Sequence, residues 1–193
     1  MTDTPAEERE LFERSKRAGA ESRWIPLLRG YVTATSAPRW ARLSGWRARG
    51  VTDVVTLQRD HEMAVWIPET CEETGLRWHH LPLSGKRLAE PDDRRSLARL
   101  PQLLELLRTP APVSPRRLVL HCSAGLHRTG VCLYLLLRLS GMSPEAALEQ
   151  LALARPLTAR ELQKRTRKTG VLVERTEALL EQPGLFQVAS AGD

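Results

Sequence analysis

The chain alternates between short runs rich in leucine and β-branched residues and longer stretches in which apolar positions recur every three or four residues. The short runs predict β-strands and the longer stretches predict α-helices. The predicted strands are 27–33 (a strand or a hairpin), 51–57, 76–83 and 117–122. The predicted helices are 37–49, 67–74, 92–108, 131–139 with a start near residue 128, one from residue 144, and a final helical region over 158–181. Strands that alternate with helices predict a single α/β domain, with a mostly parallel central sheet and helices on both faces.

Some of the boundaries carry local signals. Ser36 is in the position to cap the helix predicted over 37–49, and Ser143 followed by Pro144 starts another helix. The segment 84–93 contains glycine, proline and several charges, which predicts a loop.

The pattern divides the chain into three parts. Residues 1–22 are charged and lack an apolar face, so we expect a mobile N-terminal arm. Residues 23–182 carry the predicted strands and helices of the single domain, and 183–193 form a C-terminal tail. The chain has no apolar stretch of membrane-spanning length and no apolar signal segment near its start. We therefore expect a cytoplasmic protein without a membrane span.

Charge narrows the range of partners only slightly. The net charge of +6 favours acidic ligands such as phosphate esters. Only four of the 29 basic residues are lysine, and arginine is the better bidentate partner of phosphate. A biased codon composition explains an arginine excess equally simply, so the charge alone assigns no function. The tryptophans are expected in the core and at its edges, and no nucleic acid partner is expected.

The stretch "LVLHCSAGLHRTGVCLYLLL" (118–137) places a cysteine where a buried strand ends and a buried helix follows. Gly125 permits the sharp turn that such a short connection needs. A turn of this kind aims backbone N–H groups inward at a helix N-terminus, which makes a site for an anion. The same field stabilises the thiolate of Cys122 as a nucleophile. Arg128, five intervening residues later, can hold two phosphate oxygens, and the hydroxyl of Thr129 can reach the sulfur.

Ten residues of this stretch, "HCSAGLHRTG" (121–130), resemble the signature H-C-x-x-G-x-x-R-[ST]-G of the cysteine-dependent protein tyrosine phosphatase superfamily. The matching residues are His121, Cys122, Gly125, Arg128, Thr129 and Gly130. The short chain and its helical C-terminal third are similar to small dual-specificity phosphatases of the atypical and bacterial groups. The resemblance implies hydrolysis of phosphate monoesters through a phosphocysteine, without metal or organic cofactor. It implies that phosphate is bound by Ser123, Ala124, Gly125, Leu126, His127 and Arg128. His127 either adds positive charge at the rim of the pocket or is exposed without a role.

The general acid that protonates the leaving oxygen is harder to assign. The family uses an aspartate about 30 residues before the cysteine, and Asp92 and Asp93 stand 30 and 29 residues before Cys122. Directly after the strand, where many relatives carry this aspartate, the chain has Ser84 and Gly85. We favour Asp92 and keep Asp93 as the alternative. Either of them could instead cap the helix that begins there. Glu90 and Asp60 are weaker candidates, and Lys86 and Arg87 could contact acidic substrates.

Three other functions remain open. A phosphatase domain that binds phosphate but turns it over poorly is suggested by the missing aspartate at residue 84. Inositol phosphates and phosphoinositides are substrates of some similar proteins, and a phosphorylated protein is the other substrate class. A sulfurtransferase of the rhodanese type also cradles an anion with a cysteine loop, but the arginine spacing argues against it.

The remaining cysteines and histidines have simpler interpretations. Cys132 is expected in the core. Cys71 is expected to be a bystander, or else a resolving thiol that protects Cys122. His61, His79 and His80 do not make a metal site in this pattern, and a structural role is expected for them.

Overall fold

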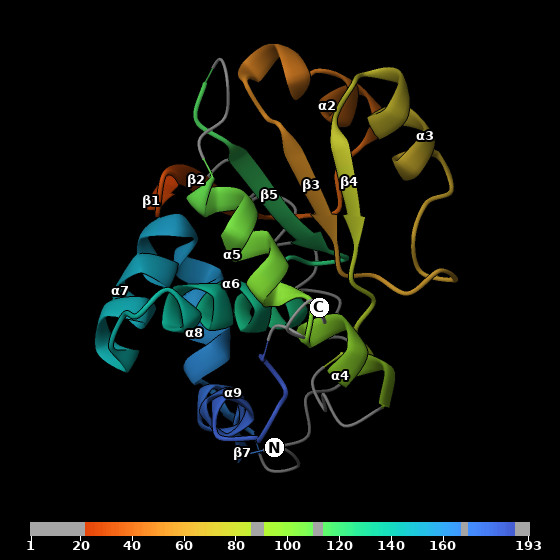
Figure 1. Ribbon diagram of the computed structural model, residues 1–193. Helices are drawn as coiled ribbons and strands as arrows, with labels where there is room; N and C mark the ends of the chain where they lie inside the picture. Colours follow the sequence, from red (N-terminus) through yellow and green to blue (C-terminus); the bar gives the residue numbers. More distant parts are fainter. Residues whose placement is uncertain (1–21, 86–90, 110–113, 167–169, 188–193) are drawn as a thin grey trace, which may run out of the picture.

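A five-stranded sheet forms the centre of the protein in this computed structural model, which describes residues 22–85, 91–109, 114–166 and 170–187 (Figure 1). The strands are β1 (Ile25–Leu27), β2 (Gly30–Ser36), β3 (Asp53–Thr56), β4 (Arg77–His80) and β5 (Arg117–Cys122). Their order across the sheet is β1-β2-β5-β3-β4. Strands β2, β5, β3 and β4 are parallel to one another, and β1 pairs with β2 as an antiparallel hairpin. The mostly parallel sheet is thus confirmed.

Strand β5 is buried on both faces because its side chains alternate between two clusters of apolar residues. Leu118 and Leu120 pack in the larger cluster, and Val119 packs in the smaller one. The C-terminal end of β5 brings Cys122 opposite Ser36 of β2. The segment that follows Cys122 therefore leaves the sheet at its carboxyl edge, where ligands bind in parallel α/β sheets.

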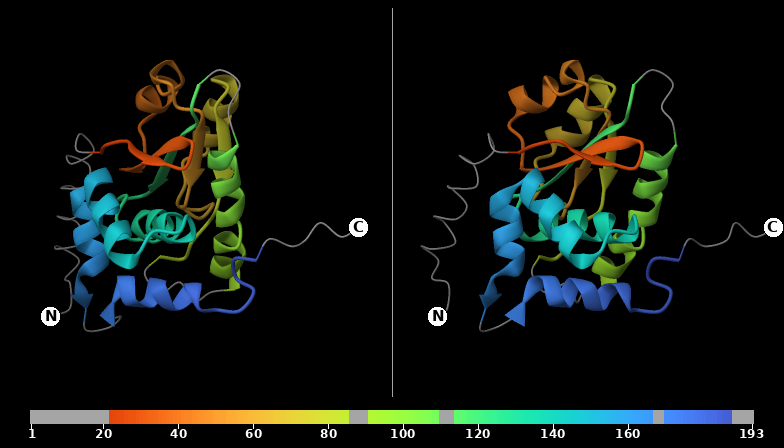
Figure 2. Two further views of the ribbon diagram at one scale, coloured as in Figure 1. Left: turned by 60° about the vertical axis from the view of Figure 1, so that its left-hand side comes forward. Right: turned by 90° about the vertical axis from the view of Figure 1, so that its left-hand side faces the viewer.

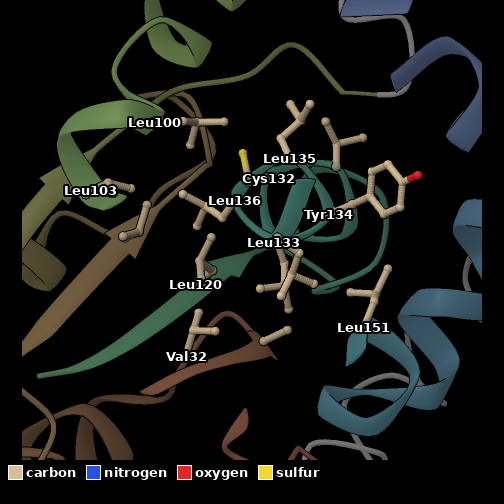
Figure 3. Packing of buried hydrophobic residues seen from close by; sticks show 14 of the residues in the cluster. Val32, Leu100, Leu103, Leu120, Cys132, Leu133, Tyr134, Leu135, Leu136 and Leu151 are labelled. Atoms are coloured by element: carbon tan, nitrogen blue, oxygen red, sulfur yellow. The ribbon is translucent and has the colours of Figure 1, made fainter. Parts of the chain in front are cut away.

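The larger cluster is built around α6 (His127–Leu139), whose residues 129–137 are all buried (Figure 3). This confirms the central helix that the all-apolar run predicts. The other helices on this side are α4 (Pro91–Leu97), α5 (Leu100–Arg108), α7 (Pro144–Ala154), α8 (Pro156–Gln163) and α9 (Leu172–Leu180) (Figure 2). Ser143 caps α7 as predicted, because its hydroxyl accepts a hydrogen bond from the backbone N–H of Ala146.

The opposite face of the sheet is covered by α2 (Trp40–Ser44), the 3₁₀ helix η2 (Arg47–Arg49) and α3 (Trp66–Glu73) (Figure 1). The smaller cluster lies here and consists of Leu43, Trp46, Val51, Val54, Ile67, Cys71, Leu76 and Val119. Helices on both faces confirm the predicted architecture.

The helix predicted over 37–49 is wrong in its start and its continuity. Ser36 is the last residue of β2 rather than a cap, because its backbone pairs with Cys122. The helix begins only at Trp40, has no side-chain cap, and ends at Gly45 before η2. The pairing of β2 along the whole length of β5 overrides the local capping signal.

Two longer predicted helices are divided. The segment 92–108 forms α4 and α5, which are separated at residues 98–99. The final helical region contains a small antiparallel pair, β6 (Arg165–Thr166) and β7 (Gly170–Val171), between α8 and α9. Gly170 has a φ of +65°, a conformation that interrupts a right-handed helix.

The described chain extends the core past residue 182. Leu185 is buried in the larger cluster and Phe186 packs against it. Ser22 is the one described residue of the predicted N-terminal arm. In the described parts of the chain, every helix is too short or too polar to cross a membrane.

Candidate active site

The segment 122–128 connects the end of β5 to the start of α6 and forms a compact loop at the carboxyl edge of the sheet. Cys122 is only 3% exposed, and the carbonyl oxygen of Ser123 accepts a hydrogen bond of 3.2 Å from the backbone N–H of Ala37. Both ends of the loop are therefore fixed to regular structure, which holds its backbone N–H groups in place.

The sulfur of Cys122 accepts two hydrogen bonds. The backbone N–H of Gly125 donates to Sγ over 3.2 Å, and the hydroxyl of Thr129 donates over 3.1 Å. Donors aimed at a sulfur at a helix N-terminus stabilise its negative charge. The structure thus brings together the sulfur, Gly125 and Thr129 as the sequence predicts.

Gly125 meets two requirements that other residues fail. Its φ is +69°, in the left-handed region. A Cβ atom on it would lie 2.2 Å from the carbonyl oxygen of Thr35 and 2.1 Å from the guanidinium of Arg155. The loop packs so closely on β2 that no side chain fits between them.

Two residues support the loop from the junction of α7 and α8, and the sequence analysis does not identify either of them. Arg155 is fully buried and donates hydrogen bonds to the carbonyl oxygens of Ala124 (3.1 Å) and Gly125. The hydroxyl of Thr158 donates to the same carbonyl of Gly125 over 2.7 Å. Arg155 and Thr158 lie 30 and 33 residues after Gly125, and this separation leaves no local signal in the sequence.

Arg128 is held from several sides. Its guanidinium donates to Ser123 Oγ (3.2 Å) and to the carbonyl oxygens of Leu83 (3.2 Å) and Leu57 (3.4 Å). It also forms an ion pair with the carboxylate of Glu62. Burial alone would raise the pKa of Glu62, but hydrogen bonds from the Arg59 N–H and from Arg128 outweigh it and lower that pKa below its ordinary value. Sequence reasoning misses Glu62 because it lies 66 residues before Arg128.

His121 lies behind the loop as part of a buried chain of hydrogen bonds. The indole N–H of Trp78 donates to Thr56 Oγ1 (2.9 Å), which lies 2.8 Å from His121 Nε2. Burial, with a smaller effect of His80, lowers the pKa of His121 to about 3. His121 is therefore neutral at physiological pH and adds no charge behind the loop.

Asp92 and Asp93 both lie in the first turn of α4. Asp92 is exposed and forms an ion pair with Arg95. Asp93 is 1% exposed, and it accepts hydrogen bonds from the backbone N–H (2.7 Å) and the hydroxyl (2.5 Å) of Ser84. The structure therefore links the serine at the family's aspartate position to a neighbouring carboxylate.

Both aspartates line a cavity of about 440 Å³. Its wall also contains Arg59, Asp60, His61, Pro82, Ser84, Arg95, Ser96 and Arg99. The cavity is next to the loop. The carbonyl oxygens of Leu57 and Leu83 bind Arg128, and these two residues are close in sequence to Arg59, Pro82 and Ser84 of the cavity wall. Asp60 is exposed here and lies 3.6 Å from His80. The weaker candidates Lys86, Arg87 and Glu90 lie outside the described residues.

His127 faces α8 rather than open solvent. Its side chain is 24% exposed, and its Nε2 lies 3.6 Å from a carboxylate oxygen of the buried Glu161. Of the other phosphate-binding candidates, Leu126 is buried, and Ala124 and Ser123 are half-buried.

The other two cysteines are buried away from solvent. Cys71 packs in the smaller cluster, and burial raises its pKa to about 11. Burial raises the pKa of Cys132 well above its ordinary value, and the charges of Cys122 and Asp93 add to the rise while Arg128 opposes it. His79 binds the buried Asp53 at 2.9 Å, which fits its expected structural role.

Comparison with known proteins places the chain in a family. The model of the tyrosine phosphatase family matches residues 9–188, so the chain belongs to this family. No curated protein matches the chain.

The chain is also similar in fold to solved phosphatases. An active form of Tk-PTP has a TM-score of 0.54 at 20% identity, covering 79% of this chain and 89% of that one. The kinase-associated phosphatase KAP, with its catalytic-site cysteine replaced by serine, has a TM-score of 0.56 at 16% identity, covering 78% and 85%. A putative protein tyrosine phosphatase from Leishmania major has a TM-score of 0.53 at 19% identity, covering 68% and 87%. At these identities the likeness concerns the fold.

Proposed function

We propose that the chain hydrolyses phosphate monoesters through a phosphocysteine intermediate, with Cys122 as the nucleophile. The observation that carries this proposal is the sulfur itself, which accepts hydrogen bonds from Gly125 and Thr129, while Arg128 donates to Ser123 Oγ in the same loop. Membership of the tyrosine phosphatase family supports the same reaction.

In the first step, a lone pair of the Cys122 thiolate attacks phosphorus and the bond from phosphorus to the ester oxygen breaks. The electron pair leaves with this oxygen, which takes a proton from the general acid. Arg128 pairs with two non-bridging oxygens, and the N–H groups of the loop 123–127 stabilise the charge of the transition state.

In the second step, water attacks the phosphocysteine and loses a proton to the same carboxylate. The sulfur–phosphorus bond breaks, and its electron pair returns to Sγ. Gly125 and Thr129 then stabilise the thiolate that leaves, and inorganic phosphate departs. Neither step needs a metal or an organic cofactor.

We assign the general acid to Asp92. Its side chain is exposed on the wall of the 440 Å³ cavity, where a leaving group can reach it. The carboxylate of Asp93 is already engaged by Ser84, so we assign it the role of positioning the segment after β4.

A phosphorylated protein is the proposed substrate. A multiply phosphorylated inositol is a second candidate, because Arg59, Arg95 and Arg99 line the cavity beside the loop and could bind further phosphates. We place the reaction in the cytoplasm, since a reducing compartment keeps a nucleophilic thiol free.

Hydrolysis of an aryl phosphate, with a chelator present, tests the reaction. The wild type should be active, and Cys122→Ser should lose all measurable turnover. Cys71→Ser is the matched control, because it alters a buried thiol in the other cluster and should retain activity. Phosphate binding without turnover in the wild type would instead indicate a binding domain. Thiosulfate-to-cyanide transfer would indicate a sulfurtransferase.

The general acid is tested by the leaving group. Asp92→Asn should slow hydrolysis most for esters with basic leaving groups and least for p-nitrophenyl phosphate. Asp93→Asn should slow the hydrolysis of all esters equally, because Asp93 positions the segment after β4 and does not donate the proton. The reverse pattern would transfer the assignment to Asp93. Phosphotyrosine and phosphoserine peptides and an inositol polyphosphate, compared by kcat/KM, identify the substrate class.

A further inference from the structure

A second cavity, of about 140 Å³, lies on the other face of the sheet from α6. Its lining residues come mainly from β2, α2 and η2 and from the segments next to them. The residues that matter here are Ser22, Trp24, Thr35, Arg42, Trp46 and Arg49. The proposed reaction uses none of them.

Two hydroxyl groups at this cavity are buried without a hydrogen-bond partner in the described chain. Thr35 is 1% exposed, and its Oγ1 makes no hydrogen bond with the described residues. Ser22 Oγ is also buried and makes no hydrogen bond with the described residues. Buried hydroxyls are nearly always bonded, so two unbonded ones at one cavity point to a missing polar partner.

The charge of the cavity is positive. Arg42 and Arg49 line it, and the described lining includes no aspartate or glutamate. Arg42 lies over the ring of Trp46, 5.9 Å from its centroid, and also makes interactions elsewhere. Burial lowers the pKa of Arg42, and the nearby charge of Arg49 lowers it further. An anion between these guanidinium groups would relieve their repulsion.

We propose that this cavity binds a phosphate-sized oxyanion, with Arg42 and Arg49 as its cationic partners and Thr35 and Ser22 as hydroxyl donors. One water molecule occupies roughly 30 Å³ in the liquid, so the cavity accommodates a tetrahedral oxyanion with few waters beside it. Arginine forks and hydroxyls are the usual donors to such an ion. The oxyanion is free phosphate or the phosphate end of an ester.

The site would be connected to the catalytic loop through β2. Thr35 pairs with His121 across the sheet, and its carbonyl oxygen packs against Gly125. A ligand that fixes Thr35 would therefore restrain the strand on which the loop rests. The proposal does not depend on catalysis, because its evidence lies wholly outside the loop.

The test is a titration of the Arg128→Met variant with inorganic phosphate. The indole N–H signals in NMR spectra monitor the binding. This variant removes the main phosphate-binding side chain of the catalytic loop. Signals of Trp24 and Trp46 should shift and saturate, while that of the exposed Trp40 should stay in place. Potassium chloride at equal ionic strength should not reproduce the shifts. Absence of a saturable shift, or the same response to chloride, overturns the proposal.

Side-chain variants localise the binding. Arg49→Met should weaken binding at least tenfold, whereas Arg47→Met, an exposed arginine of the same 3₁₀ helix outside the cavity, should leave it unchanged. Thr35→Val should weaken binding about tenfold, as expected for a hydrogen bond to a charged group. Equal binding in the Arg49 and Arg47 variants contradicts the site. Phenylphosphonate binding more tightly than phosphate assigns an ester as the ligand, and weaker binding assigns the free ion.

If Arg128→Met fails to fold, the same titration of the wild type separates the sites. Catalytic-loop binding is then reported by Trp78, which bonds to Thr56 beside His121. The response of Trp24 and Trp46 must still depend on Arg49 for the proposal to stand.

Discussion

Gly125 shows how one residue can determine both the conformation and the packing of the loop 122–128. Its positive φ and its contact with the Thr35 carbonyl are separate constraints, and a second glycine separates them. Gly75 has a similar φ of +68°, but a Cβ atom there would meet nothing within 4 Å. The two positions therefore differ only in the space around them.

Gly125→Ala should abolish turnover and lower the free energy of unfolding by more than the roughly 1–3 kcal/mol expected for backbone strain alone. The reason is the added methyl group, which forces the loop away from β2. Gly75→Ala, measured in the same urea titrations, should show the strain cost alone and keep full activity. Equal losses in both variants would show that packing on Thr35 is unimportant.

Glu62 is the one carboxylate among the groups that hold the guanidinium of Arg128 in the described chain. Glu62→Gln removes the charge of the ion pair but keeps most of the volume. Hydrogen bonds to charged groups contribute about 1.5–3 kcal/mol, so kcat/KM for an aryl phosphate should fall roughly tenfold to a hundredfold. Glu72→Gln, an exposed glutamate of α3, is the control and should have no effect. An unchanged kcat/KM in Glu62→Gln would mean that the carbonyls of Leu57 and Leu83 suffice.

These residues mark the limit of sequence reasoning at the site. The contacts of Cys122, Gly125 and Thr129 lie within eight residues, so their geometry follows from one strand, one turn and one helix. Glu62 and Arg155 reach the loop only through the tertiary fold, and periodicity contains no information about such contacts. The spacing to Cys122 makes Asp93 a candidate, but its bond to Ser84 depends on how α4 packs on the segment after β4.

At the scale of elements, α8 supports the loop through the hydroxyl of Thr158, which donates to the carbonyl oxygen of Gly125. Thr158→Val should cost about 1 kcal/mol of stability, typical of one lost hydrogen bond, and it should lower kcat/KM severalfold because Gly125 loses a restraint. Thr176→Val is a matched control, since Thr176 is equally buried and its hydroxyl bonds to Leu172 within α9. The control should lose similar stability but no activity, as measured by urea unfolding and aryl phosphate hydrolysis. A loss of activity in both variants would indicate a general loosening.

Elements were predictable where burial and local pattern agree. Strands β3, β4 and β5 and the buried α6 lie on their apolar runs, whereas the strand or hairpin predicted over 27–33 is the hairpin of β1 and β2, which extends to Ser36. The errors lie at Ser36, where sheet pairing overrides a capping signal, in 92–108, which divides into α4 and α5, and in 158–181, where an antiparallel strand pair with Gly170 at positive φ stands inside a helical pattern. At Ser36 the competing interaction is long-range, and in 158–181 it depends on the conformation of one glycine.

For the whole molecule, the burial of His121 couples folding to pH. The pKa of His121 is about 3 in the folded protein, against 6.5 for an unperturbed histidine. Between these values the unfolded chain binds a proton that the folded protein does not, so acidification favours unfolding. Most carboxylates titrate below pH 5, and the window from pH 6.5 to 5 therefore isolates the histidines.

Lowering the pH from 6.5 to 5 should reduce the free energy of unfolding by roughly 1.5 kcal/mol through His121 alone. Urea titrations at the two pH values measure the loss in the wild type, and His121→Gln should show a loss smaller by this amount. His61→Gln, an exposed histidine, should behave as the wild type does. Because His121 resists protonation, it should remain uncharged at the mildly acidic pH where a carboxylic acid donates a proton most readily. A wild-type stability that stays constant over this window would show that His121 accepts a proton within the fold, and that the loop tolerates a charge behind it.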